Sequence, residues 1–283
     1  ARELALAVPQ RAERAAAGFA ALGVKAGTRV TWELPNRFET VIASFALARL
    51  GAVQNPILPI YRHREVGFVT KQTGAKLLIV PSTWKGFDYE GMAREIASAQ
   101  PGLDVLIVDR ELPDADPASL APPPMPPSSP DDAPVRWAFY TSGTTADPKG
   151  AQHTDRTIMA SAYGMTKALA IEPDDVSALV FPFTHIGGIG WLFSSMMVGF
   201  KTIVIESFDP ATTIPVMQRE GVTLAGAGTP FHMAYLAAQR ANPEEKLLPT
   251  ARAFPGGGAA KPVQLHYDVK KELGGVGVVS GYG

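Results

Sequence analysis

The sequence predicts an α/β fold with two subdomains, each built on a mostly parallel β-sheet. Short apolar segments typical of buried strands alternate with segments of helical periodicity along nearly all of the 283 residues. Hydrophobic residues make up 46% of the chain, which is enough for a substantial core. A proline-rich stretch divides this alternation into two halves.

Residues 1–112 are expected to form the first subdomain. Helices are predicted where apolar residues recur at spacings of three and four, and strands where short apolar runs lie between helices. The predicted order is helix 9–22, strand 29–34, helix 38–50, an extended segment 53–59, helix 64–73, strand 76–80, helix 89–99 and strand 105–108. Gly23, Gly51 and Gly74 directly follow predicted helices, where glycine commonly terminates them.

Residues 113–134 differ from both halves in composition. Nine of these 22 residues are proline, and such a segment cannot maintain a helix or a central strand. We interpret it as an extended linker that runs over the surface between the two subdomains. A proline-rich ligand segment for another protein is the alternative.

Residues 135–283 are expected to form the second subdomain. The predicted order is strand 135–140, helix 154–169, strand 176–181, helix 189–198, strand 202–205, helix 211–220, strand 223–225, helix 231–241, strand 251–254, helix 263–273 and strand 276–279. The sequence stops just after that last strand, where ligands bind in open α/β sheets. We therefore expect a fragment whose second subdomain is incomplete.

Composition excludes several classes of protein. The chain has 26 basic and 27 acidic residues and no block of like charges, which argues against nucleic acid as a partner. It has no cysteine, and no apolar run reaches the roughly 18 residues of a membrane span. The expectation is a soluble, cytoplasmic protein without an integral membrane segment. The five histidines show no paired ligand spacing, so no metal site is predicted within the chain.

Residues 140–150, YTSGTTADPKG, carry the most specific pattern in the chain. Gly143 allows close backbone approach to a ligand, and Lys149 adds a positive charge. Hydroxyl groups come from Ser142, Thr144 and Thr145. Converging N–H groups and one cation suit a polyphosphate. The lysine precedes Gly150 and no hydroxyl follows it in the required place, so this is not a Walker A loop; an ordinary turn that caps the next helix is the alternative.

This stretch resembles the phosphate-binding signature [YF]-T-S-G-[ST]-T-G-x-P-K-G of the adenylate-forming enzymes. That superfamily includes acyl- and aryl-CoA synthetases, peptide-synthetase adenylation domains and luciferases. One residue departs from the pattern, since Ala146 replaces the usual glycine. Its methyl group is tolerated at φ < 0 and costly in the left-handed region. Residues 49–56, RLGAVQNP, resemble the R-x-G-A-x-x-N-P signature of acyl-CoA synthetases.

Two further motifs imply an acyl pocket. Residues 182–188, PFTHIGG, resemble the P-x-x-H-x-x-G motif, in which the histidine, here His185, lies beside the carboxylate of the acid. The same resemblance makes Gly188 and Trp191 wall residues. Residues 226–230, GAGTP, resemble the second wall, which adds Gly228 and Phe231. A structural histidine and an ordinary turn are the alternatives.

The last two motifs imply the adenine site. Residues 256–259, GGGA, resemble the G-G-A-P loop, with Ala260 in place of proline, so that Gly258 and Ala259 would contact adenine. Gly281, Tyr282 and Gly283 match the start of G-Y-G-x-T-E, whose aromatic residue stacks on the base. The threonine and the Mg²⁺-binding glutamate of that motif would follow Gly283.

The resemblance implies the large N-terminal domain of an acyl-CoA synthetase, truncated, with ATP, Mg²⁺ and coenzyme A as cofactors. Thr141 to Thr145, Lys149 and Gly150 would bind the phosphates, and His185 and Lys149 would act in catalysis. The substrate would be an apolar acid: fatty, alicyclic, aromatic or sterol-derived. The fragment alone is expected to be inactive or weakly active.

Three alternatives to this function remain open. The protein could be an acyl-AMP ligase that passes the acyl group to another acceptor. It could be a non-catalytic nucleotide- and acyl-binding module, which Ala146 and Ala260 favour. It could also be a phosphoryl-transfer enzyme that acts on the γ-phosphate.

Overall fold

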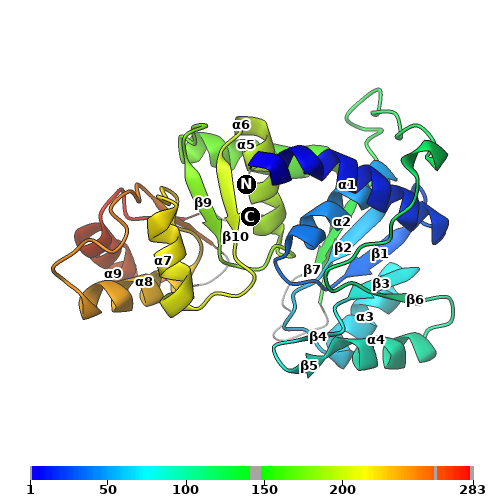
Figure 1. Cartoon of the computed structure of the whole chain (residues 1–283), viewed down its shortest axis with the longest axis horizontal. Helices are drawn as coiled ribbons and strands as arrows, with labels where there is room; N and C mark the ends of the chain where they lie inside the picture. Colours follow the sequence, from blue (N-terminus) through cyan, green and yellow to red (C-terminus); the bar gives the residue numbers. More distant parts are fainter. Residues whose placement is uncertain (1, 141–147, 258–259, 281–283) are drawn as a thin grey trace. The chain divides into compact units, whose positions relative to one another are not determined.

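The structure is a computed structural model that describes residues 2–140, 148–257 and 260–280, with side chains from residue 8 onward (Figure 1). The chain divides into two compact units, Ala1–Thr157 and Ile158–Gly283. Both are mixed α/β units with parallel-dominated sheets, so the predicted fold class is confirmed. The division lies later in the chain than the expected 113–134 linker.

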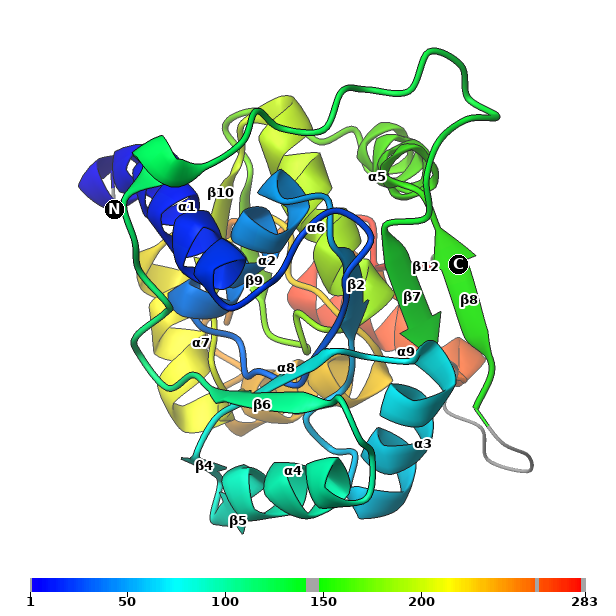
Figure 2. The ribbon, with the colours of Figure 1, turned by 90° about the vertical axis from the view of Figure 1, so that its right-hand side faces the viewer.

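A six-stranded sheet forms the centre of the first unit. Its order is β6-β3-β1-β2-β7-β8. The strands are β1 (Arg29–Trp32), β2 (Val53–Pro56), β3 (Leu77–Val80), β6 (Asp104–Ile107), β7 (Trp137–Tyr140) and β8 (Gly150–His153). Every neighbouring pair is parallel except β7 and β8, which Figure 2 shows side by side as an antiparallel pair. The sequence did not predict β8, because GAQH lacks the apolar alternation of a strand.

Helices cover both faces of this sheet. On one side α1 (Arg2–Ala21) packs against α2 (Phe38–Arg49), and on the other α3 (His63–Thr73) packs against α4 (Tyr89–Ser98) (Figure 1). A short hairpin, β4 (Thr83–Trp84) with β5 (Phe87–Asp88), precedes α4 and was not predicted. The core between α3, α4 and the sheet includes Val66, Leu78, Tyr89 and Ile96.

The proline-rich stretch belongs to the first unit rather than joining the two. Strand β7, which follows it, pairs with β2 through Gln54 and Trp137. The stretch lies against the unit and is mostly exposed. Its one regular element is a 3₁₀ turn at Pro117–Ser119. Arg49 Nη2 donates to the carbonyl of Ala121 at 3.0 Å. This pairing between strands far apart in the sequence ties the residues after the stretch to the first unit.

The second unit has two short parallel pairs, β9 (Val176–Leu179) with β10 (Lys201–Val204) and β11 (Phe254–Gly256) with β12 (Val278–Ser280). Leu224 bridges both pairs through Ser177 and Ala253. The predicted strand 223–225 is therefore reduced to this bridge, and the predicted strand 251–254 begins later, at Phe254. The result is a parallel arrangement in the order β10, β9, Leu224, β11, β12.

Helices α6, α7, α8 and α9 follow the strands of the second unit as expected. Their bounds, with α5 before them, are α5 (Asp155–Ala168), α6 (Ile186–Val198), α7 (Pro210–Arg219), α8 (Thr229–Ala241) and α9 (Val263–Asp268). The last continues as a π-helical turn, Val269–Leu273, within the predicted helix 263–273. The core includes Met217, Tyr235, Phe254 and Leu273, all at most 1% exposed.

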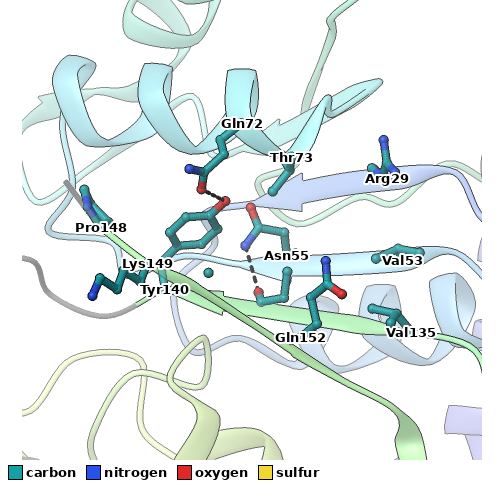
Figure 3. A pocket seen from close by; sticks show the side chains of 12 residues that line it. Arg29, Val53, Asn55, Gln72, Thr73, Val135, Tyr140, Pro148, Lys149 and Gln152 are labelled. Carbon is teal, nitrogen blue, oxygen red and sulfur yellow. Dashed lines mark hydrogen bonds between the residues drawn. The ribbon is translucent and has the colours of Figure 1, made fainter.

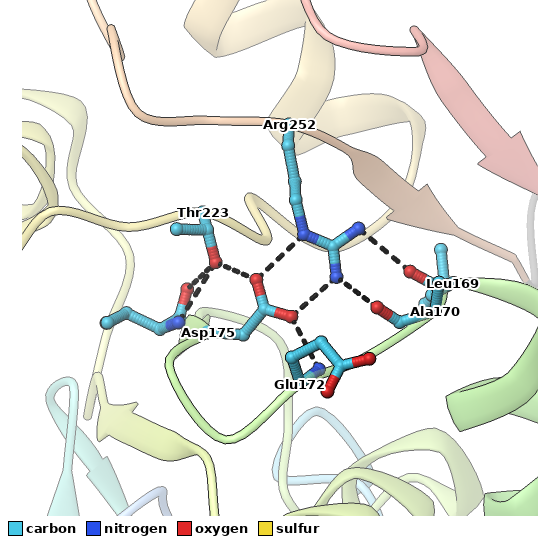
Figure 4. Close-up of polar contacts among 7 residues, drawn as sticks. Leu169, Ala170, Glu172, Asp175, Thr223 and Arg252 are labelled. Atoms are coloured by element: carbon cyan, nitrogen blue, oxygen red, sulfur yellow. Dashed lines mark hydrogen bonds and ion pairs between the residues drawn. The ribbon is translucent and has the colours of Figure 1, made fainter.

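A buried ion pair closes the amino-terminal end of the second sheet (Figure 4). Arg252 Nε and Nη2 donate to the two carboxylate oxygens of Asp175 at 2.8 and 2.5 Å. Arg252 also donates to the carbonyls of Leu169 and Ala170, and Thr223 Oγ1 donates to Asp175 at 2.6 Å. Burial alone would raise the pKa of Asp175, but the hydrogen bonds from Arg252 and its other donors lower it.

Candidate functional site

The YTSGTTADPKG motif connects β7 and β8. Tyr140 pairs directly with Gly150, so both described ends of the motif lie at the carboxyl end of β7. This is the edge at which parallel sheets bind ligands. Residues 141–147 lie outside the described part of the chain, and with them Thr141, Ser142, Gly143, Thr144 and Thr145. Lys149 and Gly150 are described, and both are exposed.

A pocket of about 640 Å³ lies beside this hairpin, over β2, β7 and β8 and next to α3 (Figure 3). Both described ends of the motif line it, since Tyr140 and Lys149 are among its residues. Its described lining holds the cations Arg29 and Lys149 and no carboxylate. The charge balance of this surface therefore favours an anion.

Hydrogen bonds fix the floor of the pocket. Tyr140 Oη donates to Gln72 Oε1 at 2.7 Å, which ties the start of the motif to α3. Burial raises the pKa of Tyr140, so its hydroxyl remains a donor at neutral pH. Asn55 accepts from Thr31 at 3.0 Å and donates to the carbonyl of Ala138 at 2.8 Å, which links three neighbouring strands.

His185 is the N-cap residue of α6 and lies beyond the end of β9. The backbone N–H of Gly187 donates to His185 Nδ1 at 3.0 Å, so the imidazole caps the helix. Because Nδ1 accepts, the proton of the neutral ring is on Nε2. Desolvation lowers the pKa of His185, a modest effect for an exposed side chain, and the edge-on ring of Phe181 lies beside it. The sequence-predicted histidine is thus a neutral Nε2–H donor near pH 7.

The two predicted wall residues of α6 have close packing partners. A Cβ on Gly188 would lie 2.5 Å from the carbonyl oxygen of Phe183, so this position accepts only glycine. Trp191 is 4% exposed, and its ring meets that of Phe200 edge to face, with centroids 5.8 Å apart. Both residues hold α6 in place. Their predicted contact with the acid remains a prediction.

The structure brings two separately predicted motifs together. Gly228 adopts φ 101° before α8, and a Cβ there would lie 3.7 Å from the carbonyl oxygen of Gly257. Thr229 Oγ1 donates to the carbonyl of Ala260 at 3.1 Å. The turn at 226–228 and the turn at 255–257 are therefore adjacent.

Of the other predicted residues of this region, only Phe231 lies in the described part of the chain. Phe231 is half-buried and packs its ring against that of Phe208, with centroids 5.0 Å apart. The adenine-site residues Gly258, Ala259, Gly281, Tyr282 and Gly283 lie outside the described part of the chain. Their described neighbours Lys261 and Ser280 contact each other through Nζ and Oγ, which joins the ends of the two segments.

Sequence reasoning missed His232. In the sequence, this residue stood out only as one of five histidines without metal-ligand spacing. In the structure, its side chain is 0% exposed and lies directly under Gly256. Burial lowers its pKa to about 4, so the ring is neutral at physiological pH. The available indication was its spacing from Tyr235 and Leu236, which places a polar residue on the buried face of a helix.

Two further features concern metals and membranes. Within the described ranges, no group of three or more His, Asp or Glu side chains could hold a metal ion. The same part of the chain contains no helix with the length and apolar character needed to cross a bilayer.

Comparison with known families identifies the class of protein. The family of AMP-binding enzymes matches residues 7–283, nearly the whole chain. The chain therefore belongs to this adenylate-forming family, and the resemblance drawn from its motifs is confirmed.

The named relatives include both CoA ligases and an acyl-AMP ligase. A 2-hydroxy-7-methoxy-5-methyl-1-naphthoate–CoA ligase of Streptomyces carzinostaticus is 29% identical over 80% of this chain and 43% of its own length. A salicyl-AMP ligase / salicyl-S-ArCP synthetase of Mycobacterium tuberculosis is 32% identical over 76% of this chain and 39% of its own length. A medium-chain fatty-acid–CoA ligase of Escherichia coli is 24% identical over 93% of this chain and 47% of its own length.

Solved structures agree on the fold. The apo structure of Mycobacterium smegmatis MbtA matches with a TM-score of 0.76 and 28% identity, over 97% of this chain and 51% of that one. A long-chain-fatty-acid-CoA ligase of Archaeoglobus fulgidus matches with a TM-score of 0.81 at 19% identity, over 97% of this chain and 55% of that one, which supports the fold alone. The chain spans about half the length of the proteins it matches.

Proposed function

We propose that this chain is part of an acyl-CoA synthetase that activates an apolar carboxylic acid with ATP and transfers the acyl group to coenzyme A. The observation that carries the proposal is the β7–β8 hairpin. Its paired ends, Tyr140 and Gly150, flank the YTSGTTADPKG sequence at the carboxyl edge of a parallel sheet, where the proposed phosphate contacts would be made. Membership of the AMP-binding family and relatives that are CoA ligases support the same reaction.

The reaction has two steps. A carboxylate oxygen of the acid attacks the α-phosphorus of ATP, the bond from that phosphorus to the bridging oxygen breaks, and pyrophosphate leaves. The thiolate of coenzyme A then attacks the acyl carbon, and AMP leaves as the thioester forms. Negative charge accumulates on the leaving phosphates in the first step, so fixed donors and cations there lower the barrier.

Two described residues have roles in this scheme. The ammonium group of Lys149, at the exposed end of the hairpin, would stabilise charge on the leaving phosphates. His185 would donate its Nε2–H to the carboxylate of the acid, because its Nδ1 is already engaged by Gly187. That hydrogen bond would orient the attacking oxygen without transferring a proton.

Mg²⁺ and coenzyme A belong to the proposal as well. Mg²⁺ bound to ATP neutralises phosphate charge. The described residues offer no carboxylate cluster for the ion, so we assign it no ligand among them. No described residue is assigned to coenzyme A either.

A second candidate differs only in the acceptor. The salicyl-AMP ligase / salicyl-S-ArCP synthetase of Mycobacterium tuberculosis is 32% identical to this chain, slightly more than the naphthoate–CoA ligase. An acyl-AMP ligase that delivers the acyl group to another acceptor is therefore the alternative. The acids named for the relatives include aryl and fatty types, and we propose an apolar acid without choosing between them.

The test is acid-dependent exchange of labelled pyrophosphate into ATP, measured on the full-length protein with a panel of aryl and fatty acids. We expect exchange with at least one acid and a loss of about 100-fold in Lys149→Ala, on the scale of removing one charge-stabilising group. The matched control is Lys76→Ala, which removes an exposed lysine just before β3 and should retain full exchange.

Each other outcome selects an alternative. Exchange without acyl-CoA formation would favour a different acceptor, and release of ADP instead of pyrophosphate would show phosphoryl transfer. ATP binding without exchange for any acid would reject the enzyme in favour of a binding module. The isolated chain 1–283 should show little or no turnover.

A further inference from the structure

A buried histidine lies between the two adjacent turns of the second unit. His232 is in the first helical turns of α8, four residues after Gly228. Its ring meets that of Phe254 edge to face, with centroids 6.2 Å apart, and that of Tyr235 at a tilt, with centroids 6.4 Å apart. Phe254 begins β11, whose last two residues belong to the 255–257 turn, so the imidazole fills the space between this helix and that strand.

The contact with the second turn is close. A Cβ on Gly256 would lie 3.0 Å from His232 Cε1 and 3.1 Å from the backbone nitrogen of Gly228. The backbone of Gly256 therefore rests on the imidazole and on the first turn at once. Any movement of the ring changes the separation of the two turns, because protein interiors are close-packed.

The polar groups of the ring face backbone. Among the described residues, neither ring nitrogen has a hydrogen-bond partner. The backbone of Pro255 and of Ala225 lies near the ring and opposes part of the pKa lowering that burial causes. Ala225 directly precedes the first turn and Pro255 begins the second, so the ring lies at the start of both turns.

We infer that His232 is a positioning residue that holds the 226–228 turn and the 255–257 turn at the separation required for the acid and the adenine to bind together. The inference rests on the proposed function, which makes these turns the acyl wall and the adenine side of one site. The positive charge of Lys261, in the segment after the adenine-side turn, acts on the ring. His232 itself touches neither substrate.

The experiment compares His232→Ala with His232→Leu in the full-length protein. The alanine variant leaves a cavity into which the turns can shift, and the leucine variant keeps most of the volume and loses the polar ring. We expect KM for ATP and KM for the acid both to rise, by about tenfold in His232→Ala and less in His232→Leu, since small misplacements have large effects on bound geometry. kcat at saturation should fall less than either KM rises.

Gln239→Ala is the matched control. Gln239 is a buried polar residue of the same helix, 5% exposed, that hydrogen-bonds to Asn242, Glu245 and Leu247, away from both turns. Its removal should lower the melting temperature and leave both KM values unchanged. If His232→Ala also lowers the melting temperature but keeps both KM values within twofold of wild type, His232 is only a core residue.

A double-mutant cycle with Gly256→Ala sharpens the result. The added methyl should disturb the turns in the wild type and do less harm in His232→Ala, where the space beneath it is free. Changes in KM for ATP that simply multiply would show that the ring and the turn are not coupled, which contradicts the inference.

A direct measurement of ATP affinity by calorimetry separates this inference from the proposed function. A wild type that binds ATP but shows no exchange would reject the function, while weaker binding by His232→Ala than by Gln239→Ala would still support the positioning role on the adenine side. Equal ATP affinity in the two variants, or no ATP binding by the wild type, would overturn the inference.

Discussion

The two units each bury a carboxylate, and the two carboxylates have opposite surroundings. Asp175, at the amino-terminal end of β9, receives hydrogen bonds from Arg252, Thr223 and the backbone of Glu172. Glu33, just past the carboxyl end of β1, is 0% exposed, and neither carboxylate oxygen has a hydrogen-bond partner among the described residues. The pKa of Asp175 is lowered and that of Glu33 is raised well above its ordinary value.

The difference follows from what lies opposite each group. Burial dominates at Glu33, and the positive charge of Arg62 offsets only part of it while Glu65 adds to it. Arg62 is directed elsewhere, since its guanidinium lies 4.0 Å from the ring centre of Phe87 and donates to the carbonyl of Pro59. A buried carboxylate thus stabilises the fold only when a donor is aimed at it.

Breaking the satisfied pair should have the largest effect. Arg252→Ala leaves Asp175 buried without its cation and frees the carbonyls of Leu169 and Ala170. We expect a loss of about 3 kcal/mol in the free energy of unfolding, at the low end of the range for buried pairs, because the Arg252 side chain is 39% exposed. Urea denaturation measures it, and a loss below about 1 kcal/mol, the value of a surface pair, would contradict this assignment.

The unsatisfied carboxylate should give a smaller change that depends on pH. The raised pKa of Glu33 means that the folded state holds a proton that the unfolded state has released. The stability contributed by that proton is complete below the unfolded pKa of about 4.3 and is lost as pH rises towards the folded value. Glu33→Gln cannot ionise, so at pH 8 it should be about 1–2 kcal/mol more stable than the wild type, as expected when an unpaired buried charge is removed.

The control for that prediction is the same comparison at low pH. At pH 4 the two proteins should unfold alike, because both carry a neutral group at position 33. Unfolding curves between pH 4 and pH 8 test this, with the charges of Arg62 and Glu65 and the hydroxyls of Tyr61 and Tyr89 common to both proteins. Parallel pH slopes would mean that Glu33 has a partner in solution.

The sequence predicted where Glu33 lies but not its burial. Taken alone, the alternation of Val30, Trp32 and Leu34 is typical of a half-buried strand, which would leave Thr31 and Glu33 on an open face. Both are 0% exposed, because α3 and α4 cover that face as well. Parallel sheets are covered on both sides, so the predicted fold class already contradicted a half-buried strand.

Long-range partners were the part that the sequence could not supply. Motifs contiguous in the chain were recognised, and the family they indicated is confirmed. Asp175 and Arg252 are 77 residues apart, and His232 meets Gly256 only because α8 packs on β11. Strand β8 depends on pairing with β7 rather than on its own residues. Such features follow from topology and not from local periodicity.

The smallest effect should come from Arg240, an exposed arginine of the second unit with two charged partners. Arg240 donates to both carboxylate oxygens of Glu272 and to Asp268, at 2.6 to 2.9 Å, so its bonds are as short as those of Arg252. Its side chain is 53% exposed, and solvent screens such pairs and competes for the same donors. We expect the urea midpoint of Arg240→Ala to match the wild type within error. A loss equal to that of Arg252→Ala would show that the number of ion pairs, rather than burial of the carboxylate, distinguishes Asp175 from Glu33.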